Sequence, residues 1–81
     1  MRYAAQIRSA RGLLGWSQGK LARAAGVGLT TIQRIERSRG VVKGNFSTIF
    51  KIQRALETAG IQFIDDEAGQ AGVSLPTKDI E

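Results

Sequence analysis

Apolar residues recur every three or four positions through the first sixty residues, the spacing that places them on one face of a helix. The spacing predicts four helices, at residues 3–14, 17–25, 28–37 and 45–59. Gly15 and Gly26 are suited to end the first and second helices, because glycine readily adopts a left-handed backbone. Ser17 is suited to cap the second helix, and Asn45 or Ser47 the fourth, since their side chains accept hydrogen bonds from free backbone N–H groups.

Each predicted helix has an apolar side that can face a shared core. Ile32 and Ile35 fall on the inner side of the third helix together with Glu36, and Val27 is a single apolar residue in the turn before it. The inner positions of the fourth helix are Phe46, Ile49, Ile52, Leu56 and Ala59. Phe50 lies off this face as a surplus apolar residue. The pattern predicts a small helical bundle with a modest core.

The pattern changes to short alternating runs after Gly60. Residues 61–64 and 73–75 alternate as β-strands do, and the eight residues between them are rich in turn-forming and acidic types. This arrangement predicts a short β-hairpin that ends at Pro76. We expect residues 77–81 to form a flexible tail.

The two sides of the first predicted strand differ in what they can contact. Ile61 and Phe63 point to one side, which can cover the helices, whereas Ile64 points to the other side of a strand with free edges. Two interpretations remain open. The hairpin folds back on its own helices, or it forms the interface of a two-fold homodimer.

Composition excludes several classes of protein. A chain of 81 residues makes one small domain. It contains no cysteine and no histidine, and so lacks disulfides, thiolate ligands, the commonest metal ligand and the commonest general base. We therefore expect no enzyme, no metal site, no cofactor and no small-molecule substrate. No apolar run approaches the roughly 18 residues of a membrane span, so we expect no membrane partner.

Charge is divided unevenly along the chain. Residues 1–60 hold eleven of the twelve Lys and Arg residues but only two acids, Glu36 and Glu57, which gives a formal charge of +9. Residues 61–81 hold five acids and one cation, Lys78, which gives −4. A small, strongly basic domain favours a polyanionic partner such as nucleic acid, the alternative being cationic helix faces that are merely solvated.

Residues 16–36, WSQGKLARAAGVGLTTIQRIE, meet the requirements of a helix-turn-helix unit. Two helices that cross steeply need small residues where they meet, and Ala22, Ala25 and Gly26 supply them. The turn needs one apolar residue that reaches the core, and Val27 fits. The second helix of such a unit buries one side and leaves the N-terminal half of the other side free.

This stretch resembles the Cro/C1-type (XRE-like) helix-turn-helix domain of bacterial and phage repressors, and the similarity extends over about residues 4–60. The matching pieces are Ile7–Arg8, Arg11, Trp16–Ser17–Gln18, Leu21–Ala22, Ala25–Gly26–Val27, Thr31–Ile32 and Ile35–Glu36. The resemblance implies a mainly α fold. It is a compact four-helix, lambda-repressor-like bundle, to which this chain adds a short C-terminal β-hairpin. The third helix is expected to read bases in double-stranded DNA.

The resemblance also implies a division of roles among the polar residues. The expected base-reading positions are Leu29, Thr30, Thr31, Gln33 and Arg34. Arg34 is suited to guanine O6 and N7, and Gln33 to adenine. The expected phosphate-binding positions are Gln18, Lys20, Gly28, Arg37, Arg39, Lys43 and Asn45. Arg11 and Glu36 are implied to form a structural ion pair between the first and third helices.

Two departures from the family pattern stand out. Gly19 and Lys20 occupy positions of the second helix where relatives usually carry acids, and Gly19 weakens that helix by about 1 kcal/mol relative to alanine. The predicted hairpin stands where many relatives continue with a fifth helix. The dimer geometry of five-helix relatives is therefore not transferred to this chain.

These inferences predict a sequence-specific DNA-binding transcriptional regulator that acts as a repressor and as a homodimer. We expect a bacterial or phage protein that is located in the cytoplasm and associated with the nucleoid. Residues 1–60 would bind DNA, residues 61–76 would serve dimerisation or a partner, and residues 77–81 would form the tail. One alternative is an antitoxin or phage control protein that also binds a protein partner through its acidic C-terminal segment. Another is a module that binds only proteins.

Overall fold

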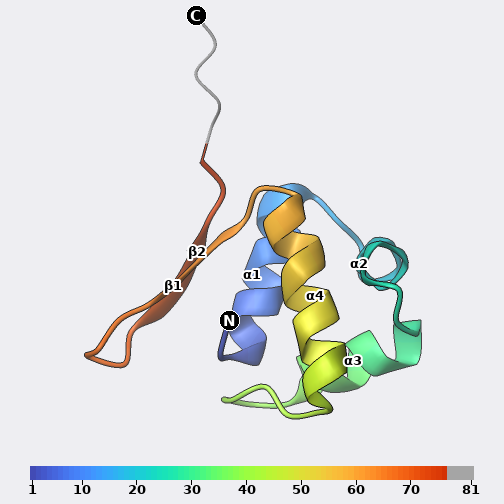
Figure 1. Cartoon of the computed structure of the whole chain (residues 1–81), viewed down its shortest axis with the longest axis horizontal. Coiled ribbons are helices and arrows are strands. Elements are labelled where there is room, and N and C mark those ends of the chain that lie inside the picture. The colour runs from blue at the N-terminus through green and yellow to red at the C-terminus, as the bar shows by residue number, and fades with distance from the viewer. Residues whose placement is uncertain (77–81) are drawn as a thin grey trace, which may run out of the picture.

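The computed structural model describes residues 1–76. Four helices and a two-stranded antiparallel sheet follow one another: α1 (Ala4–Leu14), α2 (Gln18–Ala25), α3 (Leu29–Arg37), α4 (Phe46–Thr58), β1 (Gln62–Asp65) and β2 (Ala71–Ser74). The predicted mainly α fold, a four-helix bundle followed by a C-terminal hairpin, is confirmed (Figure 1). The predicted tail at residues 77–81 lies outside the described residues.

Turn and capping residues set the limits of the helices. Gly15 and Gly26 end α1 and α2 with φ angles of 70° and 72°, in the left-handed region where a side chain would be strained. The Ser17 hydroxyl caps α2 by accepting a hydrogen bond from the Lys20 backbone N–H at 3.0 Å. Asn45, and not Ser47, caps α4, and its side-chain oxygen accepts from two backbone N–H groups of the first turn.

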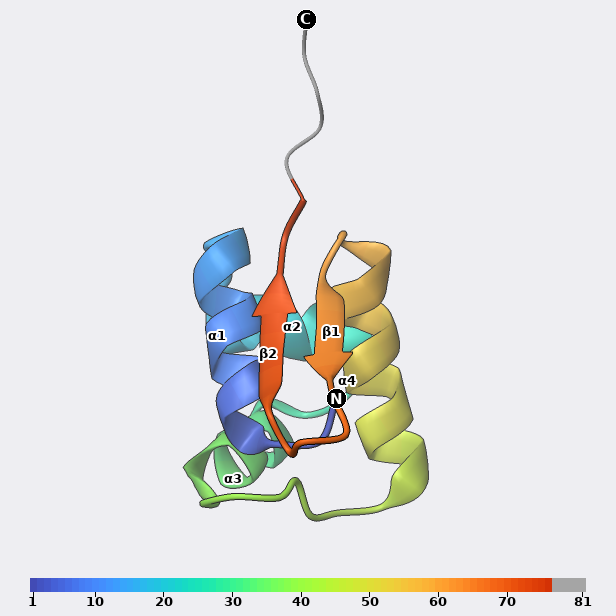
Figure 2. The same cartoon turned by 90° about the vertical axis from the view of Figure 1, so that its left-hand side faces the viewer.

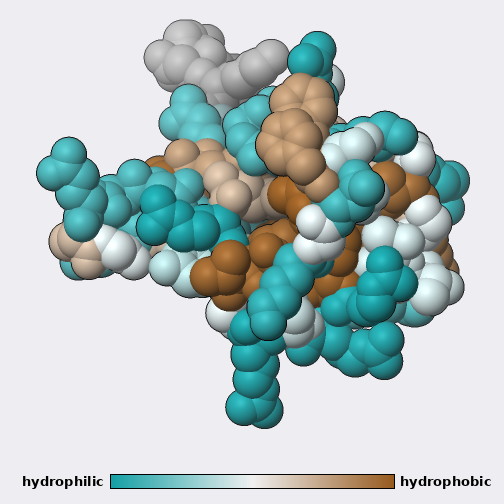
Figure 3. Space-filling view, turned by 60° about the horizontal axis from the view of Figure 1, so that its bottom comes forward, coloured by the Kyte–Doolittle hydropathy of each residue, from teal (hydrophilic) through white to brown (hydrophobic). Residues whose placement is uncertain are grey.

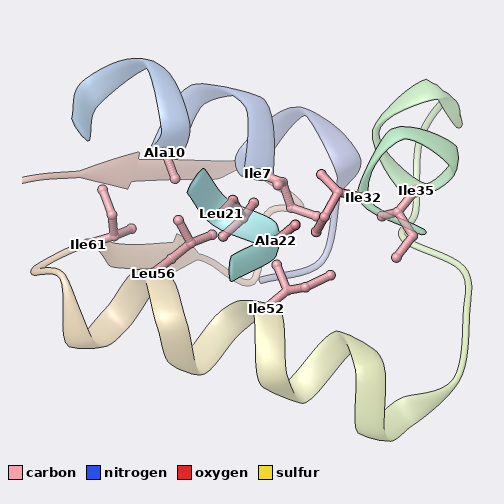
Figure 4. Close-up of a cluster of buried hydrophobic side chains, with 9 residues drawn as sticks. All are labelled: Ile7, Ala10, Leu21, Ala22, Ile32, Ile35, Ile52, Leu56 and Ile61. Carbon is pink, nitrogen blue, oxygen red and sulfur yellow. The ribbon is translucent and has the colours of Figure 1, made fainter. Parts of the chain in front are cut away.

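The core draws side chains from every helix and from the residue that leads into the hairpin (Figure 4). Its largest fully buried side chains are Ile7, Leu21, Ile32, Ile52 and Leu56. Burying a side chain of this size contributes about 1.5–3 kcal/mol. Because these five side chains come from α1, α2, α3 and α4, detaching any one helix from the bundle would expose the core. The core therefore fixes how α3 is presented.

Phe46 corrects one sequence expectation, because it was assigned to the inner side of the fourth helix and is 82% exposed. It is the first residue of α4, and its ring stacks on Phe50 with the centroids 6.2 Å apart. Residues four apart share a helix face. Phe46 therefore follows Phe50, which is also half exposed, and not Ile49 and Ile52 on the inner side.

The hairpin lies on α1, on the opposite side of the bundle from α2 (Figures 1 and 2). In the strand register Phe63 pairs with Val73 and Ile64 with Gly72. Phe63 and Val73 pack against the core, so one face of the hairpin covers the bundle. Ile64 is on the other face and is 51% exposed.

Gln6 fastens the hairpin to α1. This side chain is buried, and its amide nitrogen donates to the Gly72 carbonyl at 3.0 Å and to an Asp65 carboxylate oxygen at 3.3 Å. Its oxygen accepts from the backbone N–H groups of Arg2 and Tyr3 at 2.7 and 2.8 Å. The N-terminal ammonium group also lies 3.3 Å from Asp65. One side chain thus joins the N-terminal segment, α1 and both strands.

Candidate nucleic-acid interface

A turn at residues 26–28 joins α2 to α3 and fixes the angle at which α3 leaves the bundle. Val27 is half-buried against the core, and its backbone N–H donates to the Ala22 carbonyl at 3.0 Å. Gly28 is the N-cap of α3 and has an extended backbone. It has no side chain that could accept hydrogen bonds from the first backbone N–H groups of α3. The N-terminus of a helix in this state favours an anion.

The two sides of α3 differ sharply in exposure. Ile32, Ile35 and Glu36 are buried on the inner side. Of the residues expected to read bases, four are exposed and one, Thr31, is half-buried beside them; the exposed four are Leu29, Thr30, Gln33 and Arg34. The structure thus brings the predicted base-reading set together on one outward strip of a helix whose other side is held in the core.

Arg37 is the last residue of α3, and the loop from α3 to α4 carries two more cationic residues, Arg39 and Lys43; all three are exposed. The N-terminal segment holds this loop in place. Ala4 N–H donates to the Gly40 carbonyl at 3.0 Å, and Val42 N–H donates to the Arg2 carbonyl at 2.8 Å. Tyr3 and Val41 also form an isolated antiparallel bridge. Charges on a fixed loop are suited to a fixed row of phosphates.

The other predicted phosphate-binding residues lie at the N-termini of α2 and α4. Gln18 is half-buried, and its side-chain nitrogen donates to a Glu36 carboxylate oxygen at 3.1 Å. Because this bond occupies the side chain of Gln18, its backbone N–H group at the start of α2 is the more available donor for a phosphate. Lys20 is exposed and its ammonium lies 5.6 Å from the centre of the Trp16 ring. Asn45 is exposed, and its oxygen is occupied by the α4 cap, which leaves its NH₂ group as the donor for an anion.

Arg11 and Glu36 form a two-pronged ion pair between α1 and α3. Arg11 Nε donates to Glu36 Oε2 at 2.7 Å and Arg11 Nη2 donates to Oε1 at 2.8 Å. The Glu36 side chain is only 4% exposed, whereas that of Arg11 is 20% exposed. Hydrogen bonding to Glu36 raises the pKa of Arg11 above its ordinary value. The contribution of this ion pair to stability is therefore lost only as the pH rises through the raised pKa of Arg11.

Arg8 has a role that sequence reasoning did not assign. Its guanidinium donates a hydrogen bond to the backbone carbonyl of Glu36, near the end of α3. Arg11, besides its bonds to the Glu36 carboxylate, donates from Nη1 to the Trp16 carbonyl at 2.9 Å, in the segment before α2. Arg8 and Arg11 are three residues apart on α1, so they share a helix face. This spacing was the one sign in the sequence that Arg8 and Arg11 could orient α3 together.

The face that presents α3 and the following loop has a mixed surface. Figure 3 turns the lower side of Figure 1 toward the viewer, and hydrophilic side chains project there around a central hydrophobic area. Val41 and Phe46 are exposed apolar residues of the loop and of the start of α4. Projecting hydrophilic groups around a smaller apolar area are compatible with contacts to phosphates and to the apolar parts of nucleotides.

Two features of the described residues bear on other functions. None of the helices in residues 1–76 is long and apolar enough to cross a membrane. Within the same residues, no group of three or more potential metal ligands comes together. Asp65 instead contacts Gln6 and the N-terminus, and Asp66 accepts hydrogen bonds from the backbone N–H groups of Ala68 and Gln70 within the turn.

Comparison with known protein families supports a helix-turn-helix domain. A family model for helix-turn-helix domains, of the Cro/C1 (XRE) type, matches residues 7–60. No curated protein matches the chain significantly. The matched residues run from the first turns of α1 through α4 and end at Gly60, just before the hairpin.

Proposed function

Because the chain belongs to the Cro/C1-type (XRE) helix-turn-helix family of DNA-binding transcription regulators, we propose that it reads duplex DNA by placing α3 in the major groove. The observation that carries the proposal is the division of α3 into a buried side, Ile32, Ile35 and Glu36, and an outward strip that is polar except for Leu29. The family is generally non-enzymatic, and binding alone accounts for the proposed activity.

Bases and phosphates are contacted by different residues in this proposal. Arg34 donates to guanine O6 and N7, Gln33 contacts adenine, and Leu29 contacts a thymine methyl group. Thr30 and Thr31 lie beside them on α3. The phosphate contacts come from α2, both ends of α3, the α3–α4 loop and the N-cap of α4. The residues are Gln18, Lys20, Gly28, Arg37, Arg39, Lys43 and Asn45. Most of the affinity then comes from phosphate neutralisation and falls steeply with salt.

Two alanine variants test this division. Arg34→Ala should weaken binding to the selected site by roughly 1–3 kcal/mol and relax the preference at one base pair. Arg39→Ala should weaken binding to all duplexes alike and reduce the salt slope by about 1. The measurement is fluorescence anisotropy with a duplex selected from random sequences and with a scrambled duplex. Equal losses on both duplexes for both variants would refute the division of roles.

We propose that the protein acts as a two-fold homodimer through its C-terminal segment. Support comes from Ile64, which is half exposed on a hairpin whose inner face is already used. Two copies would read half-sites about 10 bp apart in an approximate palindrome. Sedimentation of the full chain, compared with a chain in which Ile64 is replaced by Glu, tests this. Copurification of a second small protein in place of self-association would favour the antitoxin alternative.

We propose further that binding represses transcription, because a dimer seated on two adjacent half-sites excludes other proteins from the same DNA. Transcription in vitro from a promoter that contains the selected site should fall as the protein is added. A rise in transcript would reverse the sign of regulation and leave the DNA-binding proposal intact.

A further inference from the structure

A groove between α2 and the C-terminal part of α4 has a volume of about 500 Å³. Its walls are mainly apolar: Trp16 stands before α2, Ala24 lies on α2, and Phe50 and Ala55 lie on α4. Among the described residues, those that line it include none from α3 or from the α3–α4 loop. The groove is therefore separate from the residues proposed to read bases.

The charges that the described residues place at this groove are positive. Lys51 and Arg54 line it, and the Lys20 ammonium lies 5.6 Å from the centre of the Trp16 ring. No acidic side chain of residues 1–76 is among the lining residues. An apolar floor with a cationic rim fits a segment in which acids flank an apolar side chain.

The end of the hairpin lies close to one end of this groove. Ala59, at the C-terminal end of α4, is a lining residue, and Gly60 directly follows it. The Leu75 side chain packs on Gly60 so closely that a Cβ atom there would lie 3.1 Å from Leu75 Cδ1. Figures 1 and 2 show the chain leaving β2 beside this end of α4. The residues after Pro76 therefore start from the end of α4, and not from the flank of the bundle that the hairpin covers.

The segment that follows Pro76 has the required chemistry and enough length. Its sequence is TKDIE, residues 77–81, in which two acids flank Ile80. Ile80 is four residues beyond Pro76, and four extended residues span up to about 13 Å. The part of the α4 wall from Ala59 back to Ala55 measures about 6 Å, at 1.5 Å per helical residue. Ile80 is thus within reach of the groove of its own molecule.

We propose that Ile80 docks in the α2–α4 groove of its own molecule, against Trp16 and Ala55. Asp79 and Glu81 then lie beside the cationic rim. The segment contacts α2 and α4 together, so it helps to hold the first helix of the helix-turn-helix unit against the bundle. The docking takes place within one molecule, and it depends neither on the proposed dimer nor on DNA binding.

Nuclear Overhauser effects in the full chain test this docking directly. Trp16 is the single tryptophan, so its ring signals are identified without ambiguity, and the Ile80 methyl signals are identified by their change in Ile80→Val. The expected result is an effect between the Ile80 methyl groups and the Trp16 ring at every protein concentration. An effect that appears only as the concentration rises would mean that a second copy supplies the segment. That result overturns the proposal, as does the absence of any effect.

Substitutions in the segment and in the groove separate docking from a general effect on folding. Ile80→Glu places a charge against the apolar floor, so the segment should leave and the Trp16 emission should move to longer wavelength. Unchanged emission would contradict the docking. Ala24→Glu should abolish the Overhauser effect between Ile80 and Trp16 for the same reason. Ala24 is exposed on α2, and glutamate is a good helix former, so folding is retained.

Leu13→Glu is the matched control, at an exposed apolar position of α1 outside the groove. It should leave both the Overhauser effect and the Trp16 emission unchanged. Circular dichroism checks that each variant is folded. Loss of the Overhauser effect in Leu13→Glu as well as in Ala24→Glu would show that the effect does not report contact in the groove, and would overturn the proposal.

A charge exchange tests the place of the acids. Arg54→Glu and Glu81→Arg should each reduce the Overhauser intensity by up to about fivefold, and the double variant should recover most of the loss. Recovery would support the placement of Glu81 beside the rim. A double variant no better than the single variants would overturn that placement.

Discussion

The helical bundle and the hairpin contrast in charge, in packing and in what holds them. The bundle is basic and contributes core side chains from all four helices. The hairpin is acidic, uses one face against the bundle and exposes Ile64 on the other. A two-stranded hairpin is at best marginally stable alone. The bundle therefore sets the stability of the protein, and the hairpin depends on a few contacts with it.

The contrast has a functional counterpart. Cations and the outward strip of α3 belong to the bundle, and they suit a polyanion. The acids and the exposed Ile64 belong to the hairpin, and they suit another protein surface. A change in the core of the bundle should then affect folding and, through it, DNA binding, whereas a change on the exposed face of the hairpin should affect assembly without affecting the fold of the bundle. The following substitutions test that separation.

The largest effect is expected from Glu36→Ala. It removes both carboxylate acceptors of the Arg11 guanidinium, in a pair whose carboxylate is almost fully buried. Removal of one partner from a buried ion pair costs about 3–5 kcal/mol, so the free energy of unfolding should fall by this amount. Urea denaturation measures it. Glu57→Ala, at an exposed acid of α4, is the control and should change stability by less than about 0.5 kcal/mol.

Gln6→Ala should have an intermediate and local effect. It removes four hydrogen bonds and leaves partly buried backbone groups of the N-terminal segment and of β2 unpaired, at a cost of about 1–3 kcal/mol. Hydrogen exchange should become faster at the amides of β1 and β2 while the amides of α4 remain protected. Gln53→Ala, which loses only a surface hydrogen bond to Glu57, is the control. Equal loss of protection in α4 would break the proposed separation.

Asn45→Ala should cost about 1 kcal/mol, because it removes the N-cap of α4. It should also weaken DNA binding without changing the preferred sequence, since Asn45 is proposed to contact phosphate. Asn45→Ser keeps a capping oxygen and should restore most of the stability. A changed base preference in Asn45→Ala would contradict the assignment to phosphate.

The smallest effect is a gain in stability from Gly19→Ala, of up to about 1 kcal/mol. Gly19 lies inside α2, and a Cβ atom there would meet only ordinary contacts, 3.7 Å from Arg23 and 3.8 Å from Ser17. Thermal unfolding measures the gain. Gly26→Ala is the matched comparison and should lose stability, because Gly26 has a φ angle of 72°. A loss in both variants would indicate that α2 needs its glycine for another reason.

The sequence predicted most of the fold because local signals agreed with one another. Ser17, Gly15 and Gly26 mark helix ends by chemistry that acts within a few residues. Phe46 was misassigned because apolar spacing gives the side of a helix on which a residue lies, but not whether the first residues of the helix reach the core. The roles of Gln6 and Arg8 were missed, since their partners in the hairpin and in α3 are distant in sequence.

The exposure of the candidate site's residues was predictable, but their internal contacts were not. The exposed strip of α3 follows from helical spacing. The bond from Gln18 to Glu36 does not, because it depends on how α2 and α3 cross. An apolar groove between α2 and α4, lined by residues such as Trp16, Ala24 and Phe50, was equally beyond reach. Its lining residues come from two distant segments of the chain that only the packed bundle brings together.

Chemical-shift mapping by NMR of the labelled protein, titrated with a duplex selected from random sequences, tests the central claim most directly. The largest changes should fall on the backbone amides of α3 around Thr30, Gln33 and Arg34, with smaller changes at Arg39 and Lys43. Amides of the β2 strand should remain unchanged at a constant oligomeric state. Changes confined to the hairpin, or none at physiological salt, would contradict the account.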